Sequence, residues 1–513
     1  HEQGAGFIAH GMARSTGRPA VCFATSGPGA TNLITAIADA RLDSVPLIAI
    51  TGQVPTSMLG TDAFQEVDIY NMTIPITKHN FLVRSAAELL SVIPEAFEIA
   101  LSGRPGPVLI DVPKDVQTQE IDVYGWPEIG ERLPSPPIDT DAIAQAAAMI
   151  NEAKRPVLYA GGGVMNSASH AVLREIADKN SIPVALTLMG LGCFPPDNPL
   201  YLGMLGMHAS PYTNLLLDEA DLLIAVGARF DDRAVGRVQE FCPEAAIVHI
   251  DIDRAELDKI RKAHISMACD AGEALSALLP LVRTDERREW RSRLALLREE
   301  HPFPAPRDGS QHPLSIIAAI AAAAPEDAII TTDVGQHQMW VAQGYPFTRP
   351  RTLLTSGGLG TMGFGLPAAI GAALANPGRR VVCVSGDGSI QMNIQELATL
   401  ADLGLPVTVI VLNNGQLGLV RQQQELFYGG NYIASRFETR LDFAAIAREF
   451  GISGKSIRTG EPMAAGLARA FADGGPCVVD IGVETEPNVY PIVPPGAANR
   501  DMIGGETYGK RCN

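Results

Sequence analysis

The sequence predicts an α/β protein with three doubly wound domains, each a parallel sheet covered by helices on both faces. Length, composition and a repeated unit predict this class. The chain has 513 residues, enough for about three domains. Hydrophobic residues make up 46% and charged residues 19%, as in globular proteins. The repeated unit is an apolar strand, a glycine turn, a helix, a proline and a second apolar strand, which is typical of parallel βαβ structure.

The unit occurs three times in the same order. In the first copy we expect the strand at 20–25, the turn at 26–29, the helix at 30–40 and the second strand at 47–51. In the second copy the same four elements are expected at 157–160, 161–163, 170–179 and 184–188. In the third copy they are expected at 381–384, 385–388, 393–403 and 407–412.

Two segments separate the three units. Residues 126–139 are rich in proline, and residues 284–301 are highly charged, as expected of a solvated surface helix. We expect domains at 1–125, 139–283 and 312–488, followed by a C-terminal tail at 489–513. The chain begins with His1 and turns apolar at once, so we expect the N-terminal part of the first domain to be missing.

Charge and cysteine content exclude several classes of function. The net charge of −17 argues against nucleic-acid binding. No apolar stretch approaches the roughly 18 residues of a membrane helix, so we expect no membrane partner. The seven cysteines are scattered and never form a CxxC pair, which predicts neither a disulfide framework nor a zinc site.

The third unit carries the strongest chemical pattern. Asp387, in the turn Gly386-Asp387-Gly388, follows one strand, and Asn414 follows the next. Because ligands of parallel sheets bind at the carboxyl ends of the strands, we expect these side chains to lie side by side. Their oxygens suit Mg²⁺, and the glycines with a helix starting near Ser389 suit an anion. The unit therefore predicts a diphosphate bridged to Mg²⁺, whereas the first unit has Pro28 in place of Asp387.

These residues resemble the signature of thiamine-diphosphate enzymes, and the resemblance is closest to catalytic subunits of acetohydroxyacid synthase (acetolactate synthase). It runs along essentially the whole chain, through the segments 1–5, 25–32, 60–66, 103–114, 227–233, 356–365 and 422–428. The resemblance implies a Pyr domain for the aminopyrimidine, a central FAD-binding domain and a PP domain for the diphosphate. In this family the Pyr and PP halves of a site usually come from different subunits, so we expect a homodimer or homotetramer.

The resemblance also implies roles at the thiamine site. Glu2 matches a buried Glu that hydrogen-bonds the aminopyrimidine, and burial is expected to raise its pKa. Met362 matches an apolar wedge that holds the coenzyme bent, and the Gly360 carbonyl matches the acceptor for its 4′-amino group. The other implied contacts are Pro28, Asn32, Gln336, His337, Gly386, Asp387, Gly388, Ser389 and Asn414, with Asp387, Asn414 and the Gln416 carbonyl as metal ligands.

The implied reaction is that of a transferase. Pyruvate is decarboxylated and its hydroxyethyl unit passes to pyruvate or 2-oxobutyrate, the first common step of branched-chain amino acid (isoleucine and valine) biosynthesis. Arg233 matches an Arg that binds the carboxylate of the second substrate. Gln423 stands where many relatives have a Trp that favours 2-oxobutyrate, so we expect a weak preference between acceptors. The other implied pocket residues are Phe64, Gln65 and Lys114, the last two counted as catalytic.

The central unit is expected to bind FAD. A glycine turn with a distant acid is by itself only weak evidence for a dinucleotide. The resemblance implies a structural flavin, because acetolactate formation involves no redox step. The implied contacts are Arg104, Gly161, Gly162, His208, Arg229, Asp251 and Asp270.

Two other functions stay open. A pyruvate oxidase of the same superfamily would use the flavin for electrons, but the set Gln65, Lys114 and Arg233 favours a carboligase, since an oxidase needs no second carboxylate site. A non-catalytic homologue is disfavoured by Glu2, Asp387 and Asn414. We also expect a possible small regulatory subunit, and a cytoplasmic location in a bacterium or an organellar one in a eukaryote.

Overall fold

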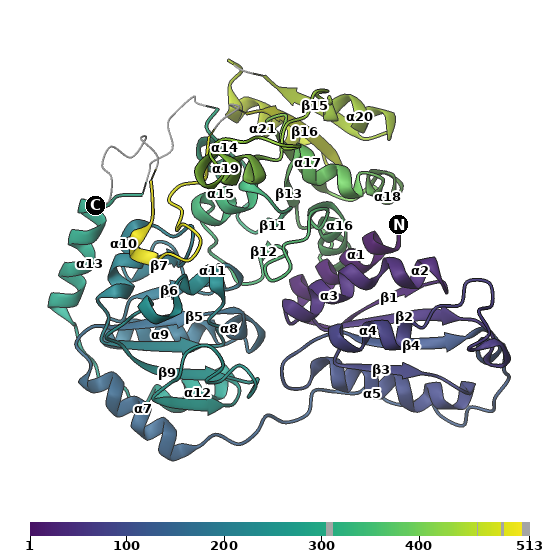
Figure 1. Cartoon of the computed structure of the whole chain (residues 1–513), viewed down its shortest axis with the longest axis horizontal. Helices are drawn as coiled ribbons and strands as arrows, with labels where there is room; N and C mark the ends of the chain where they lie inside the picture. Colours follow the sequence, from purple (N-terminus) through teal and green to yellow (C-terminus); the bar gives the residue numbers. More distant parts are fainter. Residues whose placement is uncertain (304–310, 459, 484–486, 505–513) are drawn as a thin grey trace.

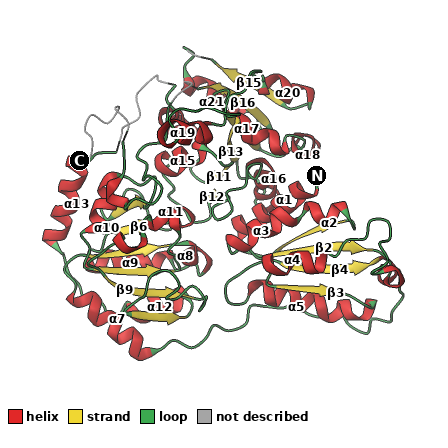
Figure 2. Cartoon of the chain, in the orientation of Figure 1, coloured by secondary structure: helices red, strands yellow, loops and turns green. Residues whose placement is uncertain are grey.

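Three parallel sheets with flanking helices make up the chain (Figures 1 and 2). The computed structural model describes residues 1–303, 311–458, 460–483 and 487–504, so the predicted tail lies partly outside the described residues. The predicted fold class, three parallel-sheet α/β domains, is confirmed. No helix in these ranges is long and apolar enough to cross a membrane. The six cysteines that they include are all free and buried.

The first sheet has the order β1-β2-β4-β3. Its strands are β1 (Ala20–Ala24), β2 (Leu47–Gln53), β3 (His79–Leu82) and β4 (Val108–Pro113). The helices around it are α1 (Glu2–Thr16), α2 (Pro28–Asn32), α3 (Ile34–Leu42), α4 (Ile69–Thr73), α5 (Leu89–Leu101) and α6 (Lys114–Gln117). The helix predicted at 30–40 is therefore two helices that are divided at Leu33, a fully buried residue whose backbone angles remain helical.

The second sheet has the order β10-β9-β8-β5-β6-β7. Its strands are β5 (Pro156–Ala160), β6 (Val184–Leu186), β7 (Tyr201–Met204), β8 (Leu222–Val226), β9 (Ala246–Asp251) and β10 (Ile265–Ala268). The helices are α7 (Thr140–Glu152), α8 (Gly162–Asn166), α9 (His170–Asn180), α10 (Pro211–Asp218), α11 (Asp232–Val235), α12 (Ala271–Leu278) and α13 (Arg288–Glu300). The charged segment forms α13, which buries Trp290, Leu294 and Leu297 and exposes its charges.

The third sheet has the order β12-β11-β13-β14-β16-β15. Its strands are β11 (Ile329–Thr332), β12 (Leu353–Leu354), β13 (Val381–Gly386), β14 (Val407–Asn413), β15 (Ser453–Ile457) and β16 (Cys477–Gly482). The helices are α14 (Pro313–Ala323), α15 (Gln336–Gly344), α16 (Gly365–Ala375), α17 (Asp387–Ile390), α18 (Glu396–Leu403), α19 (Gly418–Phe427), α20 (Phe443–Glu449) and α21 (Met463–Ala472). The helix expected near Ser389 is only the single turn α17.

The central strands of the third sheet are buried on both faces. Along β13, Val382 and Val384 belong to one apolar cluster, while Val381 and Cys383 belong to another. Successive side chains of a strand point to opposite faces, so each cluster is a layer of side chains between the sheet and one set of helices. This two-sided burial explains the continuous β-branched runs in the sequence and holds the strand ends rigidly at one edge.

The first and third domains meet through α1 and α16 (Figure 1). Gly11 approaches the backbone of Ala368, and Gly371 approaches the backbone of Ile8, so the two helices run antiparallel in close contact. Phe7 and Phe364 stack edge to face with ring centroids 5.4 Å apart. The contact places residues 356–363, which precede α16, against α3 of the first domain.

Candidate active site

A pocket opens at the carboxyl ends of β11, β13 and β14. Gly386 of β13 pairs with Leu412 of β14, so Asp387 and Asn414 follow neighbouring strands. The Gly415 N–H donates to Asp387 Oδ2 at 2.7 Å, which ties the two strand ends together. Both side chains line the pocket, as the sequence pattern predicts.

Asp387 and Asn414 are suited to a divalent cation. Burial raises the pKa of the Asp387 carboxyl to about 6, and the Gly415 N–H partly offsets that effect. Asn414 Oδ1 accepts from the Gln416 N–H at 3.1 Å. Among the described residues no group of three or more His, Cys, Asp or Glu could hold a metal. A cation here could take its other oxygen ligands from the Gln416 backbone carbonyl, a bound anion and water, which suits Mg²⁺.

Two buried polar atoms of residues lining the same pocket have no hydrogen-bond partner within the described ranges. These atoms are Gln336 Oε1 and His337 Nε2, whereas Gln336 Nε2 donates to Gln422 Oε1 at 2.9 Å. Burial lowers the pKa of His337 to about 3, so its ring is neutral and carries a single N–H. Buried polar atoms are rarely left unpaired, so these two favour a ligand in the pocket.

The glycines of the turn provide space for close approach. A Cβ at Gly386 would lie 2.9 Å from His337 Nδ1, and one at Gly388 would lie 2.5 Å from Leu417 Cδ2. The Ser389 hydroxyl donates to the Val334 carbonyl at 2.7 Å and fixes the turn against the preceding strand. Together with the cation site and the unpaired atoms, this turn fits a diphosphate bridged to Mg²⁺.

The structure brings together all the residues that the sequence assigned to the diphosphate half. They line one pocket and are Gln336, His337, Gly360, Met362, Gly386, Asp387, Gly388, Ser389, Asn414 and Gln416. Trp340 also lines it and was not predicted, because a tryptophan inside a helix gives no sequence signal that separates a pocket wall from a core residue.

Glu2 lies apart from this pocket, at the N-terminal end of α1. The Asn32 side chain donates to Glu2 Oε2 at 3.0 Å, while Pro28 is exposed at the start of α2. The described residues that line the diphosphate pocket all fall within 334–483. Glu2, Pro28 and Asn32 therefore do not line this pocket, although the ammonium group of the neighbouring His1 lies 3.2 Å from Glu396 Oε1 of the third domain.

The expected rise in the pKa of Glu2 is wrong for the isolated chain. The pKa is lowered, first because Asn32 donates a hydrogen bond to the carboxylate and second because backbone N–H groups do so. The side chain is only partly buried, so desolvation is too weak to reverse these effects.

The predicted substrate residues are exposed and do not share one pocket. The exposed fraction is 88% for Phe64 and 68% for the side chain of Arg233. Gln65, Lys114 and Gln423 are also exposed. Lys114 follows β4 at the carboxyl edge of the first sheet, whereas Gln423 lies on α19 of the third domain.

A second pocket of about 860 Å³ lies between the first and central domains. Five of the residues assigned to FAD line it, namely Arg104, Gly162, Arg229, Asp251 and Asp270. Burial raises the pKa of Asp251 to about 6. The sequence pattern missed Leu42, Asp43 and Ser44, which come from the first domain, because a dinucleotide fingerprint covers only one βαβ unit.

Gly161 and His208 are not among the residues lining this second pocket. A Cβ at Gly161 would lie 2.3 Å from the Gly227 carbonyl oxygen, so this glycine allows two backbone segments to pack. His208 Nδ1 lies 3.0 Å from the Pro491 carbonyl oxygen, and burial lowers the pKa of His208 to about 4. In the free chain both residues support structure next to the pocket.

Comparisons with known proteins agree with this geometry. The models of the N-terminal TPP-binding, central and C-terminal TPP-binding domains of thiamine pyrophosphate enzymes match residues 1–72, 143–278 and 333–481. The large subunit of acetolactate synthase isozyme 1 from Escherichia coli K12 is 56% identical over 98% of this chain and 90% of its own length.

Two further relatives come from other groups of organisms. The acetolactate synthase large subunit of Parasynechococcus marenigrum is 48% identical over 98% of this chain and 83% of its own length. The chloroplastic acetolactate synthase 1 of Oryza sativa is 47% identical over 98% and 81%. The chain therefore belongs to the acetolactate synthase large-subunit family of thiamine-diphosphate enzymes.

Proposed function

We propose that the chain is the catalytic large subunit of an acetolactate synthase. It would decarboxylate pyruvate and transfer the two-carbon unit to a second 2-oxo acid, either pyruvate or 2-oxobutyrate. The observation that carries the proposal is the diphosphate pocket, where Asp387 and Asn414 meet at neighbouring strand ends and the described residues leave Gln336 Oε1 and His337 Nε2 unpaired. Family membership supports the same function.

The pocket residues would hold thiamine diphosphate and Mg²⁺. Asp387, Asn414 and the Gln416 carbonyl would bind the cation, while Gln336 and His337 would contact the diphosphate. When bound, thiamine diphosphate supplies a carbon nucleophile and an electron sink for decarboxylation. The Gly360 carbonyl would accept from the aminopyrimidine, and Met362 would fill the space beneath it and set its orientation.

Glu2 would complete the site from a second subunit. Its carboxyl would hold a proton at a ring nitrogen of the aminopyrimidine. In the free chain Glu2 is partly exposed and its pKa is lowered, but a partner surface over Glu2 would desolvate it and raise the pKa toward neutrality. The absence of Glu2 from the residues that line the diphosphate pocket supports a homodimer as the smallest complete assembly.

The same assembly would bring the substrate residues together. Arg233 would bind the carboxylate of the second 2-oxo acid through its guanidinium fork. Phe64, Gln65 and Lys114 from the first domain would line the opposite side, and Gln423 would contact the acceptor side chain. Their exposure in the single chain supports this role, because an exposed aromatic such as Phe64 is typical of an interface.

The second pocket would hold FAD in a structural role. Arg104, Arg229 and the backbone at Gly162 would face its phosphates, while Asp251 and Asp270 would face hydroxyl groups. Leu42–Ser44 would make this flavin a contact between two domains.

A smaller partner subunit also belongs to the proposal. Several relatives carry the name large subunit, which supports assembly with a smaller one. A change in feedback inhibition when such a subunit is added would indicate that the two subunits assemble.

The test is an assay with pyruvate, thiamine diphosphate, Mg²⁺ and FAD, run beside Glu2→Gln and Asp387→Ala. We expect acetolactate from the parental protein. Glu2→Gln should keep coenzyme affinity within about 3-fold and lose most turnover, because the amide cannot hold the proton. Asp387→Ala should lose coenzyme binding, because it lacks a cation ligand. Asp402→Ala, an exposed change on α18, is the matched control and should behave as the parent.

Two results would contradict the proposal. Oxygen uptake in proportion to pyruvate consumed would indicate a pyruvate oxidase instead. Failure of the parental protein to bind thiamine diphosphate with Mg²⁺ would indicate a non-catalytic homologue.

A further inference from the structure

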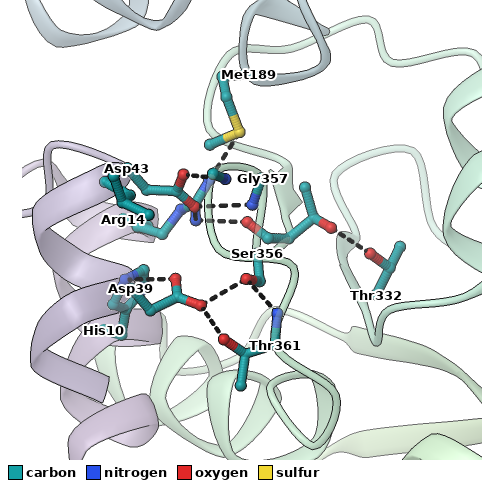
Figure 3. A network of polar contacts seen from close by, with 12 residues as sticks. His10, Arg14, Asp39, Asp43, Met189, Thr332, Ser356, Gly357 and Thr361 are labelled. Carbon is teal, nitrogen blue, oxygen red and sulfur yellow. Dashed lines mark hydrogen bonds and ion pairs between the residues drawn. The ribbon is translucent and has the colours of Figure 1, made fainter. Parts of the chain in front are cut away.

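A polar cluster joins the first domain to the loop that carries Gly360 and Met362 (Figure 3). From α3, Asp39 Oδ2 accepts hydrogen bonds from the Ser356 hydroxyl and, at 2.8 Å, from the Thr361 hydroxyl. The Ser356 hydroxyl in turn accepts from the Thr361 N–H at 2.8 Å. The carboxylate therefore closes both ends of the segment 356–361.

Asp43, one turn further along, holds the middle of the same segment. Its Oδ2 accepts from the Gly357 N–H at 2.9 Å, and its Oδ1 accepts from the Gly358 N–H at 2.7 Å. Arg14 of α1 donates to Asp43 Oδ2 at 3.0 Å and to the Thr355 carbonyl at 2.6 Å. Each hydrogen bond with a charged partner is among the stronger kinds in proteins.

The buried surroundings of Asp39 offer its carboxylate few other hydrogen-bond donors. Its side chain is fully buried, and the charged or titratable groups facing it are His10, Arg14 and Asp43. His10 Nε2 lies 3.4 Å from Asp39 Oδ1, and burial lowers the pKa of His10 well below its ordinary value. The carboxylate is thus a costly group to bury, and its two hydroxyl donors on the loop are the partners that offset this cost.

We propose that Asp39 and Asp43 are positioning residues that hold the loop 356–361 so that the Gly360 carbonyl and the Met362 side chain face the coenzyme. The inference rests on the proposed function and extends it. Glu2 in a complete site would come from a partner subunit. The loop 356–361 would instead be positioned by the first domain of the chain that contributes the diphosphate pocket. Asp43 also lines the second pocket, so its position is shared by both proposed cofactor sites.

The decisive variant is Thr361→Val, which removes one donor to Asp39 and keeps the shape of the side chain. The matched control is Thr51→Val. Thr51 donates to the buried Asp111 at the same distance, 2.8 Å, within the same first domain and away from the loop. Thr361→Ser, which retains a hydroxyl, is the rescue variant. Ser356→Ala provides a second route if Thr361→Val folds poorly.

The first readout needs no coenzyme. Amide hydrogen exchange in peptides covering 354–363 should become about 10-fold faster in Thr361→Val and return toward the parental rate in Thr361→Ser, because the segment opens more easily. Thr51→Val should leave these peptides unchanged.

The second readout separates positioning from binding. The Kd for thiamine diphosphate with Mg²⁺, followed by fluorescence of Trp340 on the pocket wall, should change by less than about 3-fold. Turnover and exchange of the coenzyme C2 proton should fall about 10- to 100-fold, as expected for a small displacement of orienting groups.

Equal loop exchange in Thr361→Val and Thr51→Val would overturn the inference, as would turnover that falls equally in both. If the parental protein fails to bind the coenzyme, the proposed function is wrong. The positioning of the loop 356–361 by Asp39 and Asp43 (the clamp) is then tested by amide hydrogen exchange in that loop alone.

Discussion

Asp387 shows how one turn residue combines the needs of folding and binding. Its carboxylate is buried at the end of β13, and this burial raises its pKa to about 6. Backbone N–H groups, such as that of Gly415, compensate part of the charge. A cation beside the carboxylate would replace the lost solvation, so the burial that costs stability in the free chain favours binding of Mg²⁺.

Gln423 determines the expected acceptor preference. It is exposed on α19, and a polar side chain is expected to make less contact with an extra methyl group than an apolar one. One methylene is worth about 1–3 kcal/mol in a hydrophobic pocket. In competition between equal concentrations of pyruvate and 2-oxobutyrate, we expect a ratio of acetohydroxybutyrate to acetolactate below about 30-fold. Gln423→Trp should raise this ratio about 10-fold or more.

A parental ratio above about 30-fold in favour of acetohydroxybutyrate would refute this role for Gln423. Gln424→Trp, one position along the same helix, is the matched control for adding an indole.

Asp111 predicts a pH dependence of stability. Burial raises its pKa to about 6, while Thr51 and Gln53 donate to it and offset part of the shift. The folded state therefore binds the proton more tightly than the unfolded state, and stability falls as pH rises from about 4 to 6. A shift of about 2 pKa units corresponds to about 3 kcal/mol at most.

The measurement is Tm against pH for the parent and Asp111→Asn. The difference between them should change across this pH range and be constant above about pH 7. A constant difference at every pH would contradict the assignment. Asp115→Asn changes a partly exposed carboxylate whose pKa is lowered by hydrogen bonds from Thr56, and it serves as the control because its effect has the opposite sign.

Individual site residues could be predicted where a motif lies on one sheet edge. Asp387, Asn414 and the glycines between them follow neighbouring strands, and the structure places them in one pocket. The ionisation of Glu2 could not be predicted, because a pKa depends on what covers the side chain. The positions of Gly161 and His208 were not predictable either, since their roles depend on contacts with Gly227 and Pro491, which are distant in sequence.

At the scale of elements, the contact of α1 with α16 joins two domains. Its small residues let the backbones touch, and a Cβ at Gly371 would lie 1.9 Å from the Ile8 carbonyl oxygen. Gly371→Ala should therefore destabilise the protein by about 1–3 kcal/mol through overpacking, although Ala is otherwise the better helix former. The midpoint of urea unfolding measures this effect.

Gly475→Ala is the control for Gly371→Ala. A Cβ at Gly475 would meet nothing within 4 Å, so this substitution should be close to neutral. Equal shifts of the urea midpoint in the two variants would contradict the close approach of the helices.

The elements themselves were predictable to a large extent, and their ends less so. Alternation of apolar strands and glycine turns predicts the order of β13, α18 and β14. The division of the first helix at Leu33 and the single-turn length of α17 depend on tertiary packing, which a local pattern does not contain. The clamp of Asp39 and Asp43 was also not predictable, because α3 and the loop are more than 300 residues apart.

At the scale of the whole molecule, the repeated unit predicts three domains but not how they share a site. The Pyr and PP halves lie in one chain, yet Glu2 is absent from the lining of the diphosphate pocket among residues 334–483. The central claim is therefore that one complete site contains Glu2 of one subunit and Asp387 of another. A site shared in this way exists only in the assembly of two subunits and not in the single chain.

The most direct test is complementation between Glu2→Gln and Asp387→Ala. The two chains are produced together with different affinity tags, and the mixed dimer is isolated through both tags. If sites are shared, one of its two sites contains both substitutions and the other contains neither, so the mixed dimer should recover about half the parental acetolactate activity. Activity no higher than that of either parent variant would contradict the shared site and place both halves within one chain.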